Sequence, residues 1–384
     1  MREMKDSGIE WIGAMPQDWQ LSKIGSLYTQ RNEKVSDKDY QPLSVTMQGI
    51  LPQLATAAKT DDGDNRKLVR VGDFAINSRS DRRGSCGISP LDGSVSLINI
   101  ILTPRTAMHP GYYNWLFHTK LFADEFYKWG HGIVADLWTT RWQEMKSITV
   151  PVPEYAEQER IAAFLDAECA EIDAVLEKTR ASIEEYKKLK QAVITQAVTK
   201  GVRGDRPMKD SGIEWIGEIP AEWSVVPFSK FASMSANLVN PSDYQDYLQV
   251  SPENIEKDSG KLLPCKTVSE VGVESWNHFF HKGQILYSKI RPKLNKVCIA
   301  PFDGLCSADM YPIDTDNISK FVVYTILSND FNQQVAMITE NRVKMPKINQ
   351  KELSKIIVVL PANRMEQQEI VDYLDGECGK IDAL

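Results

Sequence analysis

Apolar residues between positions 154 and 200 recur mostly three and four positions apart, while Glu and Lys fill most of the remaining positions. This spacing predicts one amphipathic helix of roughly 65 Å, at about 1.5 Å per residue, that ends at Gly201. A helix of this length with one apolar stripe needs a partner helix to cover that stripe. The stripe consists of Ile161, Leu165, Ile172, Val175, Thr179, Ile183, Tyr186, Leu189, Val193 and Ala197.

A different pattern fills positions 20–150, where short runs of β-branched and aliphatic residues alternate with Gly, Asp and Asn turns. These runs predict strands at 43–45, 68–71, 74–76, 95–102 and 148–152. In residues 112–129, by contrast, side chains at helical spacing predict a helix whose stripe lies in a core: Tyr113, Leu116, Phe117, Leu121 and Phe126. The stretch therefore predicts a mixed α+β domain.

The chain contains two segments twice. KDSGIEWIGAMPQDW at 5–19 returns as KDSGIEWIGEIPAEW at 209–223, displaced by 204 positions (209 − 5). EQERIAAFLDAECAEIDAV at 157–175 returns as EQQEIVDYLDGECGKIDAL at 366–384, displaced by 209 (366 − 157). Because the sequence between these frames mostly diverges, we predict two domains of one fold that recognise different ligands.

The repeat predicts a domain organisation. A first globular domain occupies 1–153, a helical spacer 154–200, a linker 201–207 and a second globular domain 208–361. The start of a second helix follows at 362–384, which is only about five turns of the length predicted for the first helix.

Composition excludes several classes of protein. The hydrophobic content of 42% is ordinary for a chain with real cores, but no apolar run approaches the roughly 20 residues of a membrane span. The first residues lack the apolar core of a signal peptide, and the six cysteines form no C-x-x-C pair. Cys169 and Cys378 hold equivalent positions in the repeat, and we expect both to be buried thiols of a reduced, cytoplasmic protein.

The sequence shows no set of catalytic residues. It has neither a G-x-x-x-x-G-K-[ST] loop nor a G-x-G-x-x-G turn, and no Asn/Asp-Pro-Pro-aromatic segment. His278 and His281 lack a Cys or acidic neighbour at metal-ligand spacing, so we expect no metal site. The chain is predicted to bind a partner rather than to catalyse a reaction, although a nuclease with dispersed carboxylates remains an alternative.

The net charge of −7 excludes a uniformly basic nucleic-acid binder, but basic residues cluster at equivalent places in both copies. Lys and Arg neutralise phosphates, and Arg, Lys, Asn and Thr reach base edges. The predicted DNA-binding residues of the first copy are Lys67, Arg70, Arg79, Arg82, Arg83, Thr140 and Arg141. Those of the second copy are Lys289, Arg291, Lys293, Asn295, Lys296, Arg342, Lys344 and Lys347.

The two repeated frames, K-D-S-G-I-E-W-I-G-x-x-P-x-x-W and E-Q-x-x-I-x-x-x-L-D, resemble those of the specificity subunit (HsdS) of type I restriction-modification enzymes. The resemblance covers essentially the whole chain. It implies two target-recognition domains that each read half of a split DNA sequence. It also implies long helices that pair as an antiparallel coiled-coil spacer, in a pseudo-twofold tandem repeat. The second helix is shorter here than the resemblance implies.

The resemblance further implies a non-catalytic subunit with several partners. These are double-stranded DNA, two methyltransferase (M) subunits and a restriction and translocase (R) subunit. AdoMet, ATP and Mg²⁺ are then expected on the partner subunits, with no cofactor on this chain. The alternative is a coiled-coil scaffold or adaptor that binds protein instead of DNA.

Geometry gives the long helix a function under this interpretation. Two readers on one face of B-DNA sit about 34 Å apart, or a multiple of that distance. A helical rod fixes such a spacing better than a flexible linker does. We therefore predict that the helix sets the number of unread base pairs, and that insertions near 195–200 change this gap. Because the two interiors diverge, the half-sites are expected to differ.

Overall fold

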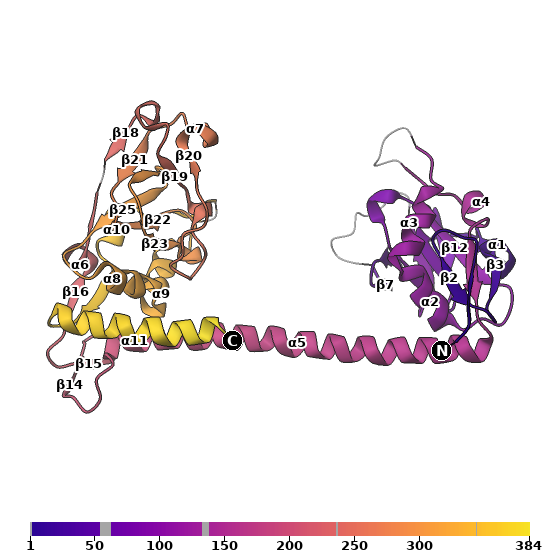
Figure 1. The fold of residues 1–384 in the computed structure, drawn as a ribbon, viewed down its shortest axis with the longest axis horizontal. Helices are drawn as coiled ribbons and strands as arrows, with labels where there is room; N and C mark the ends of the chain where they lie inside the picture. Colours follow the sequence, from indigo (N-terminus) through magenta and orange to yellow (C-terminus); the bar gives the residue numbers. More distant parts are fainter. Residues whose placement is uncertain (1, 54–62, 133–137, 236, 343) are drawn as a thin grey trace. The chain divides into compact units, whose positions relative to one another are not determined.

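The computed structural model describes residues 2–53, 63–132, 138–235, 237–342 and 344–384 (Figure 1). The chain forms two compact units, residues 1–177 and 178–384. The boundary between them lies within one helix, α5 (Tyr155–Lys200), which confirms the long helix predicted from the apolar spacing. The units are described separately below as the first and second unit.

The first unit is built on a four-stranded antiparallel sheet with the order β10-β9-β12-β4 and a three-stranded sheet with the order β11-β8-β5. Phe74, Ile76, Ile100 and Leu102 of the larger sheet are buried against aromatic residues of the helices α2 and α3. The elements are β1 (Met4–Asp6), β2 (Ala14–Pro16), β3 (Gln20–Lys23), α1 (Ile24–Leu27), β4 (Tyr28–Arg31), β5 (Lys34–Val35), β6 (Leu43–Thr46), β7 (Gly49–Pro52), β8 (Arg66–Val69), β9 (Phe74–Asn77), η1 (Ser80–Arg82), β10 (Cys86–Ile88), β11 (Gly93–Val95), β12 (Asn99–Pro104), α2 (Pro110–His118), α3 (Lys120–Lys128), α4 (Trp142–Met145) and β13 (Thr149–Val152).

The helix predicted at 112–129 is two helices, and Thr119 separates them. Thr119 has extended backbone angles (φ −64°, ψ 142°), and its hydroxyl accepts a hydrogen bond from Phe122 N at 3.2 Å, so it caps the second helix. The break divides the predicted stripe. Phe117 and Phe126 are buried, whereas Leu121 is 59% exposed.

The second unit repeats this topology, which confirms the prediction of one fold in two copies. Its four-stranded sheet has the order β23-β22-β25-β17, and a five-stranded sheet has the order β18-β21-β24-β19-β20. Before α11 its elements are β14 (Met208–Asp210), β15 (Glu218–Pro220), β16 (Ser224–Pro227), α6 (Phe228–Phe231), β17 (Ser233–Met234), β18 (Leu238–Val239), η3 (Pro241–Tyr244), β19 (Leu248–Val250), η4 (Pro252–Asn254), β20 (Lys266–Thr267), α7 (Val268–Val271), β21 (Asn277–Phe280), β22 (Ile285–Ser288), η5 (Pro292–Leu294), β23 (Val297–Ile299), β24 (Gly304–Cys306), β25 (Met310–Asp314), α8 (Ser319–Leu327), α9 (Asn329–Thr339), α10 (Gln350–Leu353) and β26 (Ile357–Leu360).

The last helix, α11 (Arg364–Asp382), lies alongside the end of α5 within the second unit (Figure 1). Lys190 forms an ion pair with Asp382 at 2.6 Å, and Arg203 forms one with Glu369 at 2.7 Å. Lys190 of α5 thus pairs near the C-terminal end of α11, whereas Arg203, three residues after α5 ends, pairs near the N-terminal end of α11, so the two helices are antiparallel, as predicted.

The two equivalent cysteines differ in burial. Cys378 on α11 is 5% exposed because it faces the core of the second unit. Cys169 on α5 is only half-buried, so the expectation of two buried thiols is wrong for Cys169. All six cysteines of the chain are free thiols.

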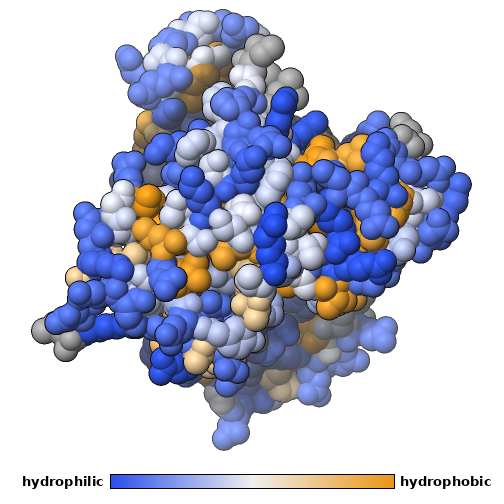
Figure 2. Space-filling model, turned by 90° about the vertical axis from the view of Figure 1, so that its right-hand side faces the viewer, coloured by the Kyte–Doolittle hydropathy of each residue, from blue (hydrophilic) through white to orange (hydrophobic). Residues whose placement is uncertain are grey.

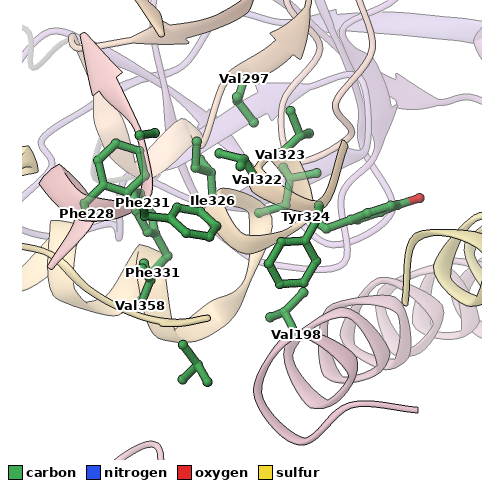
Figure 3. Packing of buried hydrophobic residues seen from close by; sticks show 14 of the residues in the cluster. Val198, Phe228, Phe231, Val297, Val322, Val323, Tyr324, Ile326, Phe331 and Val358 are labelled. Atoms are coloured by element: carbon green, nitrogen blue, oxygen red, sulfur yellow. The ribbon is translucent and has the colours of Figure 1, made fainter. Parts of the chain in front are cut away.

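The largest hydrophobic core belongs to the second unit and joins its sheet, its helices and the end of α5. Phe228, Phe231 and Phe331 gather with Ile326 at its centre, and Val198 of α5 lies at its edge (Figure 3). The face of the molecule in Figure 2 is mainly hydrophilic, with hydrophobic side chains in separate patches. Among the described helices, none is long and apolar enough to cross a bilayer.

Candidate nucleic-acid interface

In the second unit, two basic segments that are distant in the sequence form one surface. The loop 289–295 follows β22 and contains the turn η5. Arg291 N donates a hydrogen bond to Pro346 O at 2.8 Å, and Ile348 N donates to Lys289 O at 2.9 Å. These two bonds hold the loop 289–295 against residues 344–350, and Arg342 lies just before that segment in the sequence. We call this surface the second basic surface.

The first unit joins its basic segments with the same two bonds. The loop 78–84 follows β9 and contains the turn η1. Ser80 N donates to Trp138 O at 3.0 Å, and Thr140 N donates to Ser78 O at 3.0 Å. The loop 78–84 therefore packs beside residues 138–141, and together they form the first basic surface.

The two loops correspond residue by residue. Asn77 N donates to Ser85 O in the first, and Ser288 N donates to Lys296 O in the second, so each bond closes a loop of seven residues. The last residue of each loop has a left-handed backbone: Gly84 (φ 79°) and Asn295 (φ 44°). Gly and Asn are the residues that adopt this conformation most readily.

The same alignment pairs the two cations that precede these residues. Arg82 and Lys293 both lie two positions before the left-handed residue. Both side chains are exposed. Each unit therefore presents one cation at the same point of its loop.

The second basic surface carries three exposed cations, Arg291, Lys293 and Lys344, with no ion-pair partner among the residues that the structure describes. Two further predicted residues are neutralised by acids: Lys347 by Asp309 at 2.9 Å and Arg342 by Glu352 at 2.5 Å.

The paired cations stiffen the surface. The guanidinium of Arg342 lowers the pKa of the Glu352 carboxyl, which also accepts a hydrogen bond from the backbone of Asn349. The ion pair Arg342–Glu352 thus joins Arg342 to the helix α10, and the ion pair Lys347–Asp309 joins Lys347 to the loop between β24 and β25.

Three predicted residues of the second unit support the loop instead of facing solvent. The ammonium group of Lys289 donates to Ala308 O and lies over the ring of Tyr311. That of Lys296 donates to Pro252 O at 2.6 Å, and Asn295 is 1% exposed. In this conformation they fix the backbone from which Arg291 and Lys293 project.

The first basic surface is more strongly paired. Arg83 forms an ion pair with Asp124 at 2.9 Å and lies over the ring of Tyr127. Arg82, whose side chain is 68% exposed, lies 3.7 Å from the carboxylate of Asp81. Arg79 is half-buried, whereas Arg141 is exposed at the start of α4.

Three further predicted residues of the first unit, Thr140, Lys67 and Arg70, do not add a free positive charge to this surface. Thr140 is fully buried, and its hydroxyl donates to Phe126 O at 2.8 Å. Lys67 donates to Asn99 O at 2.7 Å, and burial lowers its pKa. Arg70 lies after β8 and pairs with Asp92 at 3.3 Å.

The sequence interpretation missed the residues that set these charges. Glu352 neutralises Arg342. The sequence Asn349-Gln-Lys-Glu352 could have indicated the position of Glu352, because it is a capping box at the start of α10. Asp309 and Asp124 carry no comparable local signal. Among the described residues no group of three or more His, Cys, Asp and Glu side chains is arranged to hold a metal ion.

Comparison with known proteins shows a family likeness for part of the chain. Residues 228–376 match the family model described as the type I restriction modification DNA specificity domain. This part of the chain is therefore similar to the specificity domain of type I restriction-modification enzymes. The match contains the whole second basic surface, from Lys289 to Lys347.

A curated protein shares part of the sequence. The type I restriction enzyme EcoDI specificity subunit of Escherichia coli is 38% identical over 247 residues, which are 59% of this chain and 54% of that protein. The chain thus spans about half the length of this relative.

The fold is shared with solved structures. A chain of a solved type I R-M system has a TM-score of 0.71 at 14% identity, covering 96% of this chain and 92% of that one. The HsdS subunit from Thermoanaerobacter tengcongensis has a TM-score of 0.52 at 15% identity, covering 96% and 91%. At this identity the likeness shows the fold alone.

Proposed function

We propose that this chain is the DNA-binding specificity subunit of a type I restriction-modification system and reads an asymmetric bipartite target. One observation carries the proposal. Both units hold a seven-residue basic loop against a second basic segment through the same pair of backbone hydrogen bonds. Each unit therefore presents one such surface with exposed cations, and each surface can contact the phosphates of one polyanion.

The differences between the two surfaces support two different half-sites. At the position before Pro292 the second loop has Arg291, where the first loop has Ser80. The adjoining segments are Pro346-Lys347-Ile348 and Trp138-Thr139-Thr140. A common backbone therefore presents different hydrogen-bonding groups, and direct readout of base edges depends on those groups.

The partners follow from the same proposal. The chain binds double-stranded DNA and docks M subunits, two of them if both frames are used, together with an R subunit. AdoMet, ATP and Mg²⁺ bind to those partners. This chain is the non-catalytic subunit that directs the M and R subunits to their DNA target. The six free thiols fit the reducing cytoplasm where such a system acts.

Removing the two exposed cations of the second loop tests the proposal. We expect R291A/K293A to bind mixed-sequence duplex DNA about tenfold or more weakly. Its plot of log affinity against log salt should be shallower by about 2, because about one counterion is released per phosphate contact. K209A/K230A removes the same charge at exposed positions outside the surface and should change neither quantity. Fluorescence anisotropy from about 50 to 200 mM salt measures both.

The same variants separate DNA reading from an adaptor function. If the wild-type chain binds duplex DNA without salt dependence, or if both double variants behave alike, the basic surfaces do not contact phosphate. With the M partner present, sequencing of methylated adenines in DNA modified by R291A/K293A should show one half-site relaxed and the other retained.

A further inference from the structure

The two repeated frames of the sequence meet in the folded protein. In the first unit, Glu157 lies in the first turn of α5. Its carboxylate accepts a hydrogen bond from Arg2 at 2.8 Å and from the indole N–H of Trp19 at 3.1 Å. The hydrogen bond from Arg2 and then that from Trp19 lower the pKa of Glu157. The N-terminal frame is thereby bound to the start of the long helix.

The second unit repeats the arrangement and buries it more deeply. Glu366 lies in the first turn of α11 and accepts hydrogen bonds from Arg206 and, at 2.9 Å, from the indole N–H of Trp223. Glu366 and Trp223 are both fully buried. Glu157, by comparison, keeps a side-chain exposure of 13%.

The next residue of the frame binds the globular part of the same unit. Gln158 accepts a hydrogen bond from His109 N at 3.0 Å and donates one to Pro153 O at 2.8 Å. Gln367 accepts one from Ile318 N at 3.0 Å. His109 and Ile318 are the N-caps of α2 and α8, so each glutamine ties a long helix to a core helix of its unit.

The aspartate of the frame provides a third attachment. Asp166 accepts from the indole N–H of Trp115 at 2.8 Å, and Asp375 accepts from the hydroxyl of Tyr324 at 2.7 Å. In both helices it lies nine residues after the glutamate (166 − 157 and 375 − 366). Nine residues correspond to about 13 Å along the helix and about half a turn around it.

Three attachments spread in this way restrain both the rotation and the tilt of a helix relative to its domain. We infer that Glu157 and Glu366 are positioning residues that fix the direction in which each long helix leaves its recognition domain, and so restrict the gap between half-sites. This inference rests on the proposed function. We call Arg2, Trp19 and Glu157, and likewise Arg206, Trp223 and Glu366, the helix anchors.

The test uses the full chain with its M partner and DNA in which the two mapped half-sites are separated by the native gap or by one or two base pairs more or fewer. Methylation is measured at every gap. For the wild type, one gap should dominate. E157Q keeps the shape of the side chain and removes the negative charge that strengthens the bonds from Arg2 and Trp19, and W223F keeps an aromatic ring and removes the indole N–H donor. In both variants the preference for the native gap should fall by about tenfold or more.

Two controls separate anchoring from stability. E369A removes an exposed partner of Arg203 on the same helix α11 and should leave the gap preference unchanged. A merely stabilising anchor would lower methylation in E157Q and W223F by the same factor at every gap, and that result would overturn the inference. Thermal unfolding measures whether each variant is folded. If W223F, at the fully buried anchor of the second unit, does not fold, E157Q alone provides the test.

Failure of the underlying function gives a different result. If the wild-type chain and M partner methylate DNA without regard to the two half-sites, the proposed function is wrong. If the wild type is selective and the anchor variants keep its gap preference, only the positioning inference is wrong.

Discussion

Inserting a second copy of residues 171–177 directly after Glu177 of α5 should abolish methylation of the native DNA target and transfer it to a target with a longer gap. Seven residues add about 10 Å to a helix and turn its faces by only about 20°, so the helical stripe continues nearly in register. At 3.4 Å per base pair, the added length is about three base pairs. The two half-sites should stay the same, because the insertion lies outside both basic surfaces. Sequencing of methylated adenines gives the half-sites and the gap together.

The structure decides where this insertion belongs. Positions 195–200, predicted as the insertion site, lie next to Ile194 and include Ala197 and Val198, which are buried in the core of the second unit. An insertion there would disturb that core. Residues 170–189 are exposed throughout, so added turns there remove no buried contact.

A flexible insertion provides the control. Seven Gly and Ser residues after Glu177 add the same number of residues and interrupt the helix, because Gly has poor helix propensity. We expect this variant to lose its preference for a single gap. If the helical insertion leaves the native gap unchanged, α5 does not set the spacing.

The duplicated frames predicted the duplicated topology well. The strand β9 was predicted from its apolar run between turn residues, and the long helix was predicted because its spacing persists for more than 40 residues. Long periodic stretches of this kind are predicted reliably, because tertiary contacts seldom change their secondary structure. The break between α2 and α3 at Thr119 was not predicted from the sequence. A single Thr inside a periodic stretch becomes a helix cap only when the chain turns there.

The basic surfaces were predicted in outline but not in detail. Counting cations located both segments of each surface, yet it could not show that the segments are joined by backbone bonds such as Arg291 N to Pro346 O. It also could not distinguish Lys293, which is exposed, from Lys296, whose ammonium group donates a hydrogen bond to Pro252 O. The acceptors are backbone carbonyls brought close by folding, and no sequence pattern marks them.

The contact between the two frames also required the structure. Each frame was recognisable as a repeat, but no pattern in it indicated a hydrogen-bond partner for Trp19 or Trp223. Their indole N–H groups instead bind Glu157 and Glu366, about 140 residues away in the chain. Sequence spacing over such distances carries no geometric information, although the repetition of both frames in one order was a hint that they act together.

Replacing Phe331 with Ala should destabilise the second unit by about 3–5 kcal/mol. Phe331 is 2% exposed and lies among Phe228, Phe231 and Ile326 (Figure 3), with ring centroids 5.6 Å from Phe228 and 6.4 Å from Tyr287. The substitution removes most of an aromatic side chain from a close-packed core, so the loss combines its transfer free energy with the cost of a cavity.

Met337 offers a matched control on the same helix, α9, because its side chain is 70% exposed. M337A should change the free energy of unfolding by less than about 0.5 kcal/mol. Urea unfolding followed by Trp fluorescence measures both variants, and the transition of the second unit should move to lower urea in F331A with its slope unchanged. Equal stability of F331A and M337A would mean that Phe331 is not packed as the structure describes. The helix anchor of the second unit and the second basic surface adjoin this core through Trp223 and Ile348, so F331A should also weaken DNA binding as its transition is approached.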